Sequence, residues 1–156
     1  MKFSIFCILV FYIPSVFSQN LLDLRIREIV GRKKFLFFNE GIFHKESSST
    51  SRVKAMRHSY SKKRGYERIV VDFSSKKLPK VYGHFSSNEK KLSLDFFKTS
   101  LNKNVGSFGV SNFVKAFKFY PLSKEFLSME ILFKKAVRAE IFYLNSPARL
   151  VIDIKV

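Results

Sequence analysis

The sequence predicts an all-β protein, a sandwich of two related, mainly antiparallel four-stranded sheets formed by an internal repeat. Three observations lead to this fold class: the residue composition, an alternation of inward apolar residues with mostly polar ones, and a similarity between two parts of the chain. The 156 residues include 19 phenylalanines and no tryptophan. Aromatic and β-branched side chains suit half-buried strands, because helices restrict their rotamers.

Apolar and polar residues alternate most clearly in segments 68–73 and 149–154. This pattern is typical of an antiparallel sheet that has one buried face and one solvent face. The residues expected in the core are Ile69, Val71, Leu92, Leu94, Met129, Ile131, Leu150 and Ile152. The residues expected on the solvent faces are Arg68, Val70, Asp72, Arg149, Val151 and Asp153.

The internal repeat appears when residues 68–97 are overlaid on residues 126–155, a shift that needs no gap. The matched pairs include Asp72 with Glu130, Lys91 with Arg149 and Asp95 with Asp153; upstream, Val53 matches Val114 once a three-residue length difference in the following turn is allowed. Two copies of one unit are too few for an open solenoid, so they must close on each other. We therefore expect each copy to supply one sheet of the sandwich.

Residues 1–18 are expected to be a signal peptide. Lys2 precedes a mostly apolar run, residues 3–17, which is too short to cross about 30 Å of hydrocarbon comfortably, and cleavage before Gln19 fits the residues around it. An uncleaved N-terminal anchor remains the alternative, because only one positive charge precedes the run. The single cysteine, Cys7, would leave with the peptide. The mature chain would then be exported, free of disulfides and without a transmembrane helix.

The remaining chain is expected to divide into two parts. Residues 52–156 should form the β-sandwich domain, and residues 19–51 an N-terminal segment and linker. The end of that segment, residues 46–51, is small and polar, as linkers are. Whether the rest of it forms a short helix or strands is open from the sequence.

The chain is strongly basic, with 29 lysines and arginines against 12 acids and a net charge of +17. Such a field favours polyanionic partners, which outside the cytoplasm include cell-wall polymers, lipopolysaccharide, acidic phospholipid and nucleic acid. Nucleic acid is disfavoured, because the sequence lacks Arg-Gly aromatic tracts and groove-reading motifs.

Three segments, Val53–Arg57, Glu67–Phe73 and Asn145–Ile154, resemble the AMIN domain, a family named for its position in front of bacterial N-acetylmuramoyl-L-alanine amidases. The last is the most specific, since an asparagine and a proline turn precede Arg-Leu-Val-Ile-Asp-Ile. The resemblance covers residues 53–156. It implies a periplasmic domain of two related four-stranded sheets that binds peptidoglycan without cutting it and holds amidases and secretin pores at the cell wall. The chain departs from the family in its high basic charge, notably in the turn at residues 59–66.

Candidate peptidoglycan-binding residues lie on outward strand faces and around one turn. They are Arg68, Asp72, Arg149 and Asp153 on the strands, and Arg57, Lys62, Lys63 and Arg64 before and within the turn. The planar guanidinium of arginine binds carboxylates in a bidentate fork, and carboxylates hydrogen-bond sugar hydroxyls. The alternative is cross-strand ion pairing that only makes the sheet soluble.

No enzyme is expected. The three histidines, His44, His58 and His84, show no His-x-x-x-His spacing and no glutamate at metal-ligand spacing, so no catalytic residue, metal or cofactor is predicted. The leading hypothesis is a non-catalytic module that attaches to peptidoglycan or another anionic envelope polymer. The alternative is an assembly or targeting factor that binds a secretin or a divisome protein.

The first prediction concerns the N-terminus of the exported protein. Cleavage after Ser18 should leave Gln19 as the first residue, because the apolar run ends there. Intact-mass spectrometry of the protein recovered from the envelope measures this directly. A mass that includes Met1 would show that the segment is an anchor instead.

Overall fold

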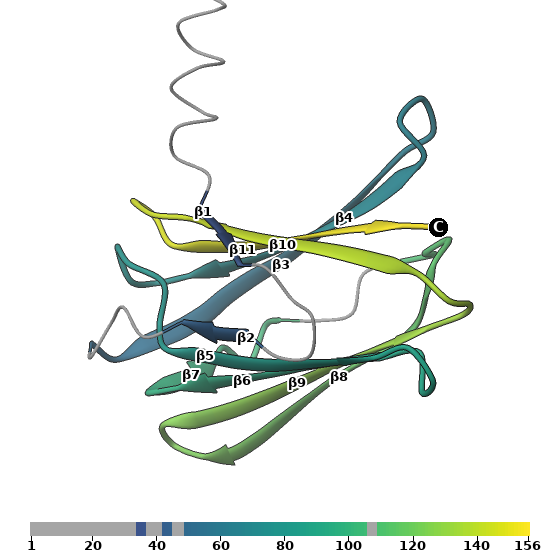
Figure 1. Ribbon diagram of the computed structural model, residues 1–156. Helices are drawn as coiled ribbons and strands as arrows, with labels where there is room; N and C mark the ends of the chain where they lie inside the picture. Colours follow the sequence, from purple (N-terminus) through teal and green to yellow (C-terminus); the bar gives the residue numbers. More distant parts are fainter. Residues whose placement is uncertain (1–33, 37–41, 45–48, 106–108) are drawn as a thin grey trace, which may run out of the picture. The chain divides into compact units, whose positions relative to one another are not determined.

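A computed structural model describes residues 34–36, 42–44, 49–105 and 109–156 (Figure 1). The expected signal peptide, its cleavage site and most of the segment 19–51 lie outside these residues. The described residues belong to one compact unit, Arg32–Val156. They contain no helix long and apolar enough to span a membrane.

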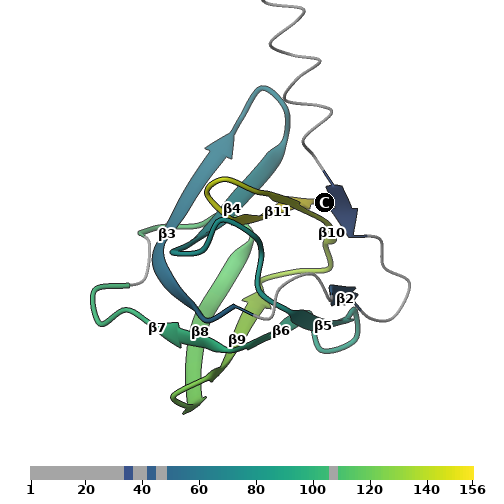
Figure 2. The ribbon, with the colours of Figure 1, turned by 90° about the vertical axis from the view of Figure 1, so that its left-hand side faces the viewer.

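Within the described residues, the secondary structure consists of strands in two sheets, which confirms the all-β class. Sheet A has the order β1 (Lys34–Leu36), β10 (Arg138–Leu144), β11 (Arg149–Lys155), β4 (Tyr66–Phe73), β3 (Ser51–Ser61) and β7 (Thr99–Leu101). Sheet B has the order β2 (Ile42–His44), β5 (Val81–Ser86), β6 (Lys91–Phe97), β9 (Phe126–Phe133) and β8 (Val114–Ser123). The pairing of β3 with β7 is parallel, whereas the other ladders are antiparallel. Figure 1 and Figure 2 show the sheets as two layers.

Both halves of the chain contribute to both sheets. Hairpins β3–β4 and β10–β11 lie in sheet A, and hairpins β5–β6 and β8–β9 lie in sheet B. The expectation that each half supplies one sheet is therefore wrong. Alternation specifies which side chains of a strand face the core, but it does not specify which strand lies beside it.

The core lies between the sheets and contains the residues that alternation placed there. All eight predicted core residues are fully buried, with exposed fractions of 0%. The rings of Phe73 in sheet A and Phe96 in sheet B lie 5.3 Å apart between centroids, so the inner faces are in direct contact. Leu78 and Ala148, which lie in connections, are also fully buried.

One face of β11 departs from the simple alternation. Val151 and Asp153 were expected in solvent, but only 3% and 7% of their surfaces are exposed. β11 is a central strand, and Val151 lies between Phe142 of β10 and Val70 of β4 in the ladder. Flanking side chains from two neighbouring strands therefore cover positions that a single strand pattern assigns to solvent.

The second prediction tests the core. Leu94→Ala should lower the free energy of unfolding by about 2–5 kcal/mol, because it removes a fully buried side chain and leaves a cavity. Leu122→Ala is the matched control, since 66% of Leu122 is exposed, and it should change stability by less than about 0.5 kcal/mol. Equilibrium urea unfolding measures both. Equal losses would contradict the placement of Leu94.

Candidate functional site

Two candidate site residues, Arg68 and Asp153, pair with each other across strands β4 and β11. Arg68 Nε donates to Asp153 Oδ1 and Nη2 donates to Oδ2, both at 2.6 Å. The guanidinium carbon also lies 5.2 Å from the ring centroid of Tyr66 and 5.5 Å from that of Phe142. The hydrogen bond to Asp153 raises the pKa of Arg68, although burial acts in the opposite direction. The Nε–Nη2 fork of Arg68 is therefore occupied by a carboxylate of its own chain.

A second bidentate pair joins Arg57 of β3 to Asp72 of β4. Both Arg57 donors lie 2.7 Å from the carboxylate oxygens, and the hydrogen bond raises the pKa of Arg57. Arg149 lies opposite Asp72 in the ladder between β4 and β11, but its Nε is buried without a hydrogen-bond partner in the described part of the chain. Cross-strand neighbours, and not residues four apart on one strand, thus form the pairs. Both pairs use Nε and Nη2, so a ligand carboxylate can reach Arg57 or Arg68 only at the Nη1 side of the guanidinium or by displacing the aspartate.

The remaining candidates, Lys62, Lys63 and Arg64, form the basic tip of hairpin β3–β4. Two backbone bonds close the turn, from Arg64 N and Gly65 N to Ser61 O at 3.2 and 2.9 Å. Gly65 has φ of 63°, a conformation that glycine adopts at little cost. The three basic side chains are exposed, and none has a carboxylate partner within the described residues. In Figure 1 the hairpin projects past the ends of the neighbouring strands.

Most acids of the described part form ion pairs or hydrogen bonds with other residues of the same chain. Besides the two arginine pairs, Lys91 lies 2.8 Å from Glu89, and Lys155 lies 2.7 Å from Glu140. The hydrogen bond from Lys91 lowers the pKa of Glu89. Because cations greatly outnumber acids, these pairs leave many exposed cations without a counter-charge. The exposed cations without a carboxylate partner in the described part of the chain include the basic tip and Lys54, Lys76, Lys77, Lys115, Lys118 and Lys124.

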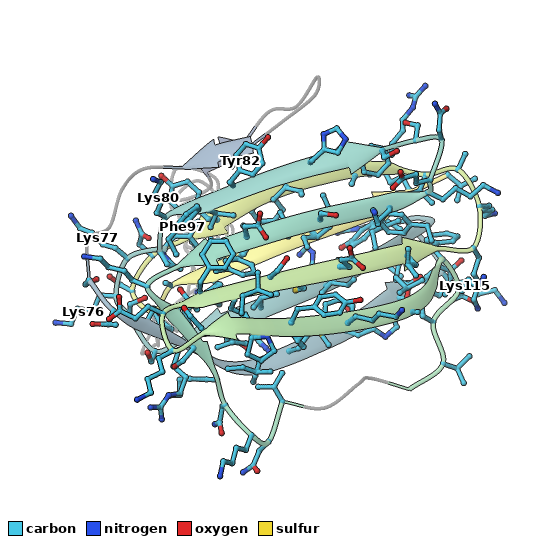
Figure 3. The ribbon with its side chains drawn as sticks, turned by 90° about the horizontal axis from the view of Figure 1, so that it is seen from below. Lys76, Lys77, Lys80, Tyr82, Phe97 and Lys115 are labelled. Atoms are coloured by element: carbon cyan, nitrogen blue, oxygen red, sulfur yellow. The ribbon has the colours of Figure 1, made fainter. Side chains whose placement is uncertain are left out.

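The outer face of sheet B combines cations with aromatic rings. Lys80 Nζ lies 4.6 Å from the ring centroid of Phe97, and Phe97 meets Phe126 edge-on at 5.0 Å. Tyr82 is 47% exposed and lies opposite Asp95 in the ladder. Figure 3 shows Lys80, Tyr82 and Phe97 gathered toward one end of this sheet, with Lys115 at the other. The sequence reasoning missed this face, because the alternation was read mainly for the core.

A buried acidic cluster was also missed. Glu67 is fully buried on the inner side of β4, where its carboxylate accepts hydrogen bonds from His58 Nε2, from Ser111 Oγ and, at 2.7 Å, from the Phe113 backbone N–H. These bonds fix Ser111 and Phe113 against β4 and satisfy a carboxylate that would otherwise be costly to bury. Its position could have been inferred, since Glu67 has the same strand parity as the core residue Ile69. In the part of the chain that the structure describes, no group of three or more metal-ligating side chains gathers.

Comparison with protein-family models gave no match for this chain, and comparison with curated proteins gave none either.

The third prediction concerns the two arginine pairs. A double-mutant cycle with Arg68→Ala and Asp153→Ala should give a larger coupling energy than one with Arg57→Ala and Asp72→Ala. The Arg57 side chain is 57% exposed, so its pair should contribute about 0.2–1 kcal/mol, whereas Asp153 is nearly buried. Urea unfolding of each variant, repeated in 1 M NaCl, measures both couplings. An Arg68–Asp153 coupling that vanishes in salt would show that this pair is only a surface contact.

Proposed function

We propose that this chain is a non-catalytic envelope-binding module that attaches to peptidoglycan after export to the periplasm. The observation that carries the proposal is the basic tip: its three cations are exposed and have no carboxylate partner within the described residues, while Asp72 and Asp153 are paired with Arg57 and Arg68. Peptidoglycan is a suitable partner because it is a polar glycan whose attached stem peptides carry carboxylates. The attraction acts over about one Debye length, roughly 8 Å at physiological ionic strength.

The AMIN resemblance supports the same proposal. We also infer that the halves of the chain are two copies of one unit. Hairpin β3–β4 has a register shift between Val53 and Ala55, and hairpin β8–β9 has one between Val114 and Ala116. Each of these hairpins is followed by a hairpin in the other sheet. When the two hairpins are aligned on these register shifts, Asp72 corresponds to Leu132. The gapless overlay of the sequence instead matches Asp72 with Glu130, two residues earlier.

Of the binding residues that the sequence suggested, we propose that the basic tip binds the polymer and that four others have a structural role. The basic tip is free to approach a polymer, whereas Arg57, Arg68, Asp72 and Asp153 are engaged with one another. We assign these four residues to holding strands β3, β4 and β11 in register. This arrangement stiffens the base of the hairpin that presents the tip.

The fourth prediction tests the basic tip by sedimentation with purified sacculi. The triple variant Lys62→Gln, Lys63→Gln, Arg64→Gln should bind several-fold more weakly than wild type at low salt. Its binding should also depend less on salt, because the variant lacks the three cations whose attraction to the polymer is screened by salt. The matched control is Lys115→Gln, Lys118→Gln, Lys124→Gln, which removes the same charge from strand β8 and its turn. It should lose less binding.

Circular dichroism establishes that both triple variants are folded. Equal losses in the two variants would assign binding to net charge and not to the tip. Failure of the wild type to sediment at any salt concentration would contradict peptidoglycan binding. Sedimentation only after addition of a purified secretin or divisome protein would favour the assembly-factor alternative.

A further inference from the structure

An open pocket of about 380 Å³, lined by polar residues, lies at the edge of sheet A where β3 pairs with β7. Its lining includes Thr50, Arg52, Lys54, Ser74, Ser100 and Asn102. These residues are cationic, hydroxyl-bearing or amide side chains, and no carboxylate is among them. The composition therefore differs from that of an apolar ligand site and from that of a cation site.

The parallel pairing of β3 with β7 brings the pocket residues together from distant parts of the sequence. Arg52 lies opposite Ser100 in this ladder, and its Nε donates to Ser100 Oγ at 3.4 Å. On the other side, the Arg52 backbone N–H donates to Ser74 Oγ and the Ser74 N–H donates to Arg52 O, both at 2.9 Å. Ser74 thus holds the backbone of Arg52 on one side, and the exposed side chain of Arg52 reaches Ser100 on the other.

Donors are in excess at this pocket. The two terminal amino groups of Arg52 and the Lys54 ammonium have no hydrogen-bond partner within the described residues. Ser74 Oγ and Ser100 Oγ each accept a hydrogen bond from Arg52, so their own hydroxyl protons are available to a ligand. Asn102 Oδ1 accepts from the Asn104 N–H at 3.4 Å, which leaves its amide protons for donation. Two positive charges and several neutral donors are therefore available to bind one anionic acceptor group.

We propose that this pocket binds an oxyanion, a carboxylate or a phosphate, carried on a polar sugar or peptide unit. Bidentate guanidinium bonds together with an ammonium and hydroxyl groups are the usual means of holding such groups. The volume exceeds that of a bare ion, so the unit that carries the anion has room beside it. The source of the anion rests on the proposed function: in peptidoglycan it is a carboxylate of the lactyl group or of the stem peptide.

The pocket and the basic tip lie at opposite ends of one strand. Between Arg52 and Ser61, β3 spans about 30 Å at roughly 3.3 Å per residue. A polymer with repeated anionic groups can therefore engage both places at once. Two weak contacts on one rigid element raise the overall affinity, because binding at one keeps the other at high effective concentration.

The fifth prediction uses the full chain, labelled with ¹⁵N, and three small probes. Titration with N-acetylmuramic acid or with glycerol 3-phosphate should shift the backbone amide signals of residues 50–54, 74 and 100–102 saturably. Neutral N-acetylglucosamine should not shift them. The variant Arg52→Gln, Lys54→Gln should bind the anions at least about tenfold more weakly, the effect of 1.4 kcal/mol. The control Lys118→Gln, Lys124→Gln should bind as wild type does.

The two anions distinguish the source. Shifts with both support a general oxyanion site, shifts with N-acetylmuramic acid alone support a carboxylate-bearing sugar, and shifts with glycerol 3-phosphate alone support a phosphate-bearing unit. The inference is overturned if neither anion shifts the pocket amides at millimolar concentration, or if the folded pocket variant binds as tightly as wild type. If the chain binds sacculi but the anions do not shift the pocket amide signals, only this site is refuted. Anion binding in the pocket without sacculus binding refutes only the peptidoglycan proposal.

Discussion

The architecture depends on two strand ladders that join the first half of the chain to the second. β4 pairs with β11 in sheet A, and β6 pairs with β9 in sheet B. Each ladder joins two hairpins into a wider sheet with one continuous apolar face, and the two faces close on each other. The same β4–β11 register sets Arg68 opposite Asp153. Without these ladders, each hairpin would expose its apolar side, and isolated hairpins are marginally stable in water.

The ladders also determine how charge is distributed. Cross-strand neighbours on the outer face of sheet A engage Asp72 and Asp153 with arginines, so these acids cannot neutralise cations elsewhere. Turns and exposed strand positions carry the surplus positive charge, and the hairpin β3–β4 presents part of it on a hydrogen-bonded ribbon. A basic tip on a stiff support loses little freedom when it meets a polymer. The proposed function therefore depends on which charges the fold places in ion pairs and which cations it leaves exposed without a carboxylate partner.

The sequence predicted the faces of the strands well and their neighbours poorly. Leu92, Leu94, Leu150 and Ile152 are buried as expected, because a strand with a period of two has only two faces and the apolar one turns inward. Strand order depends on the packing of the whole domain, and no local pattern encodes it. The division of each half between the sheets was therefore not predicted.

The candidate site was predicted in part for the same reason. The basic turn at residues 62–64 is visible as a run of charges, and the fold leaves it exposed. The partners of Arg57 and Arg68 could not be read from spacing along one strand, because they lie on neighbouring strands. The pocket at Arg52 depends on a parallel pairing with the three-residue strand β7, nearly fifty residues later. So short a strand carries too little pattern to be recognised in a sequence.

We propose that cations without a partner in the described part of the fold bind the anionic groups of the cell wall. The most direct measurement compares binding of the full wild-type chain to untreated sacculi and to sacculi whose carboxylates have been converted to neutral amides. The glycan and its shape are retained in both, so only the charge of the polymer differs. Amidation is expected to abolish most of the binding at low salt and to remove its salt dependence. Equal binding to both preparations would contradict the proposal and would indicate recognition of the glycan itself.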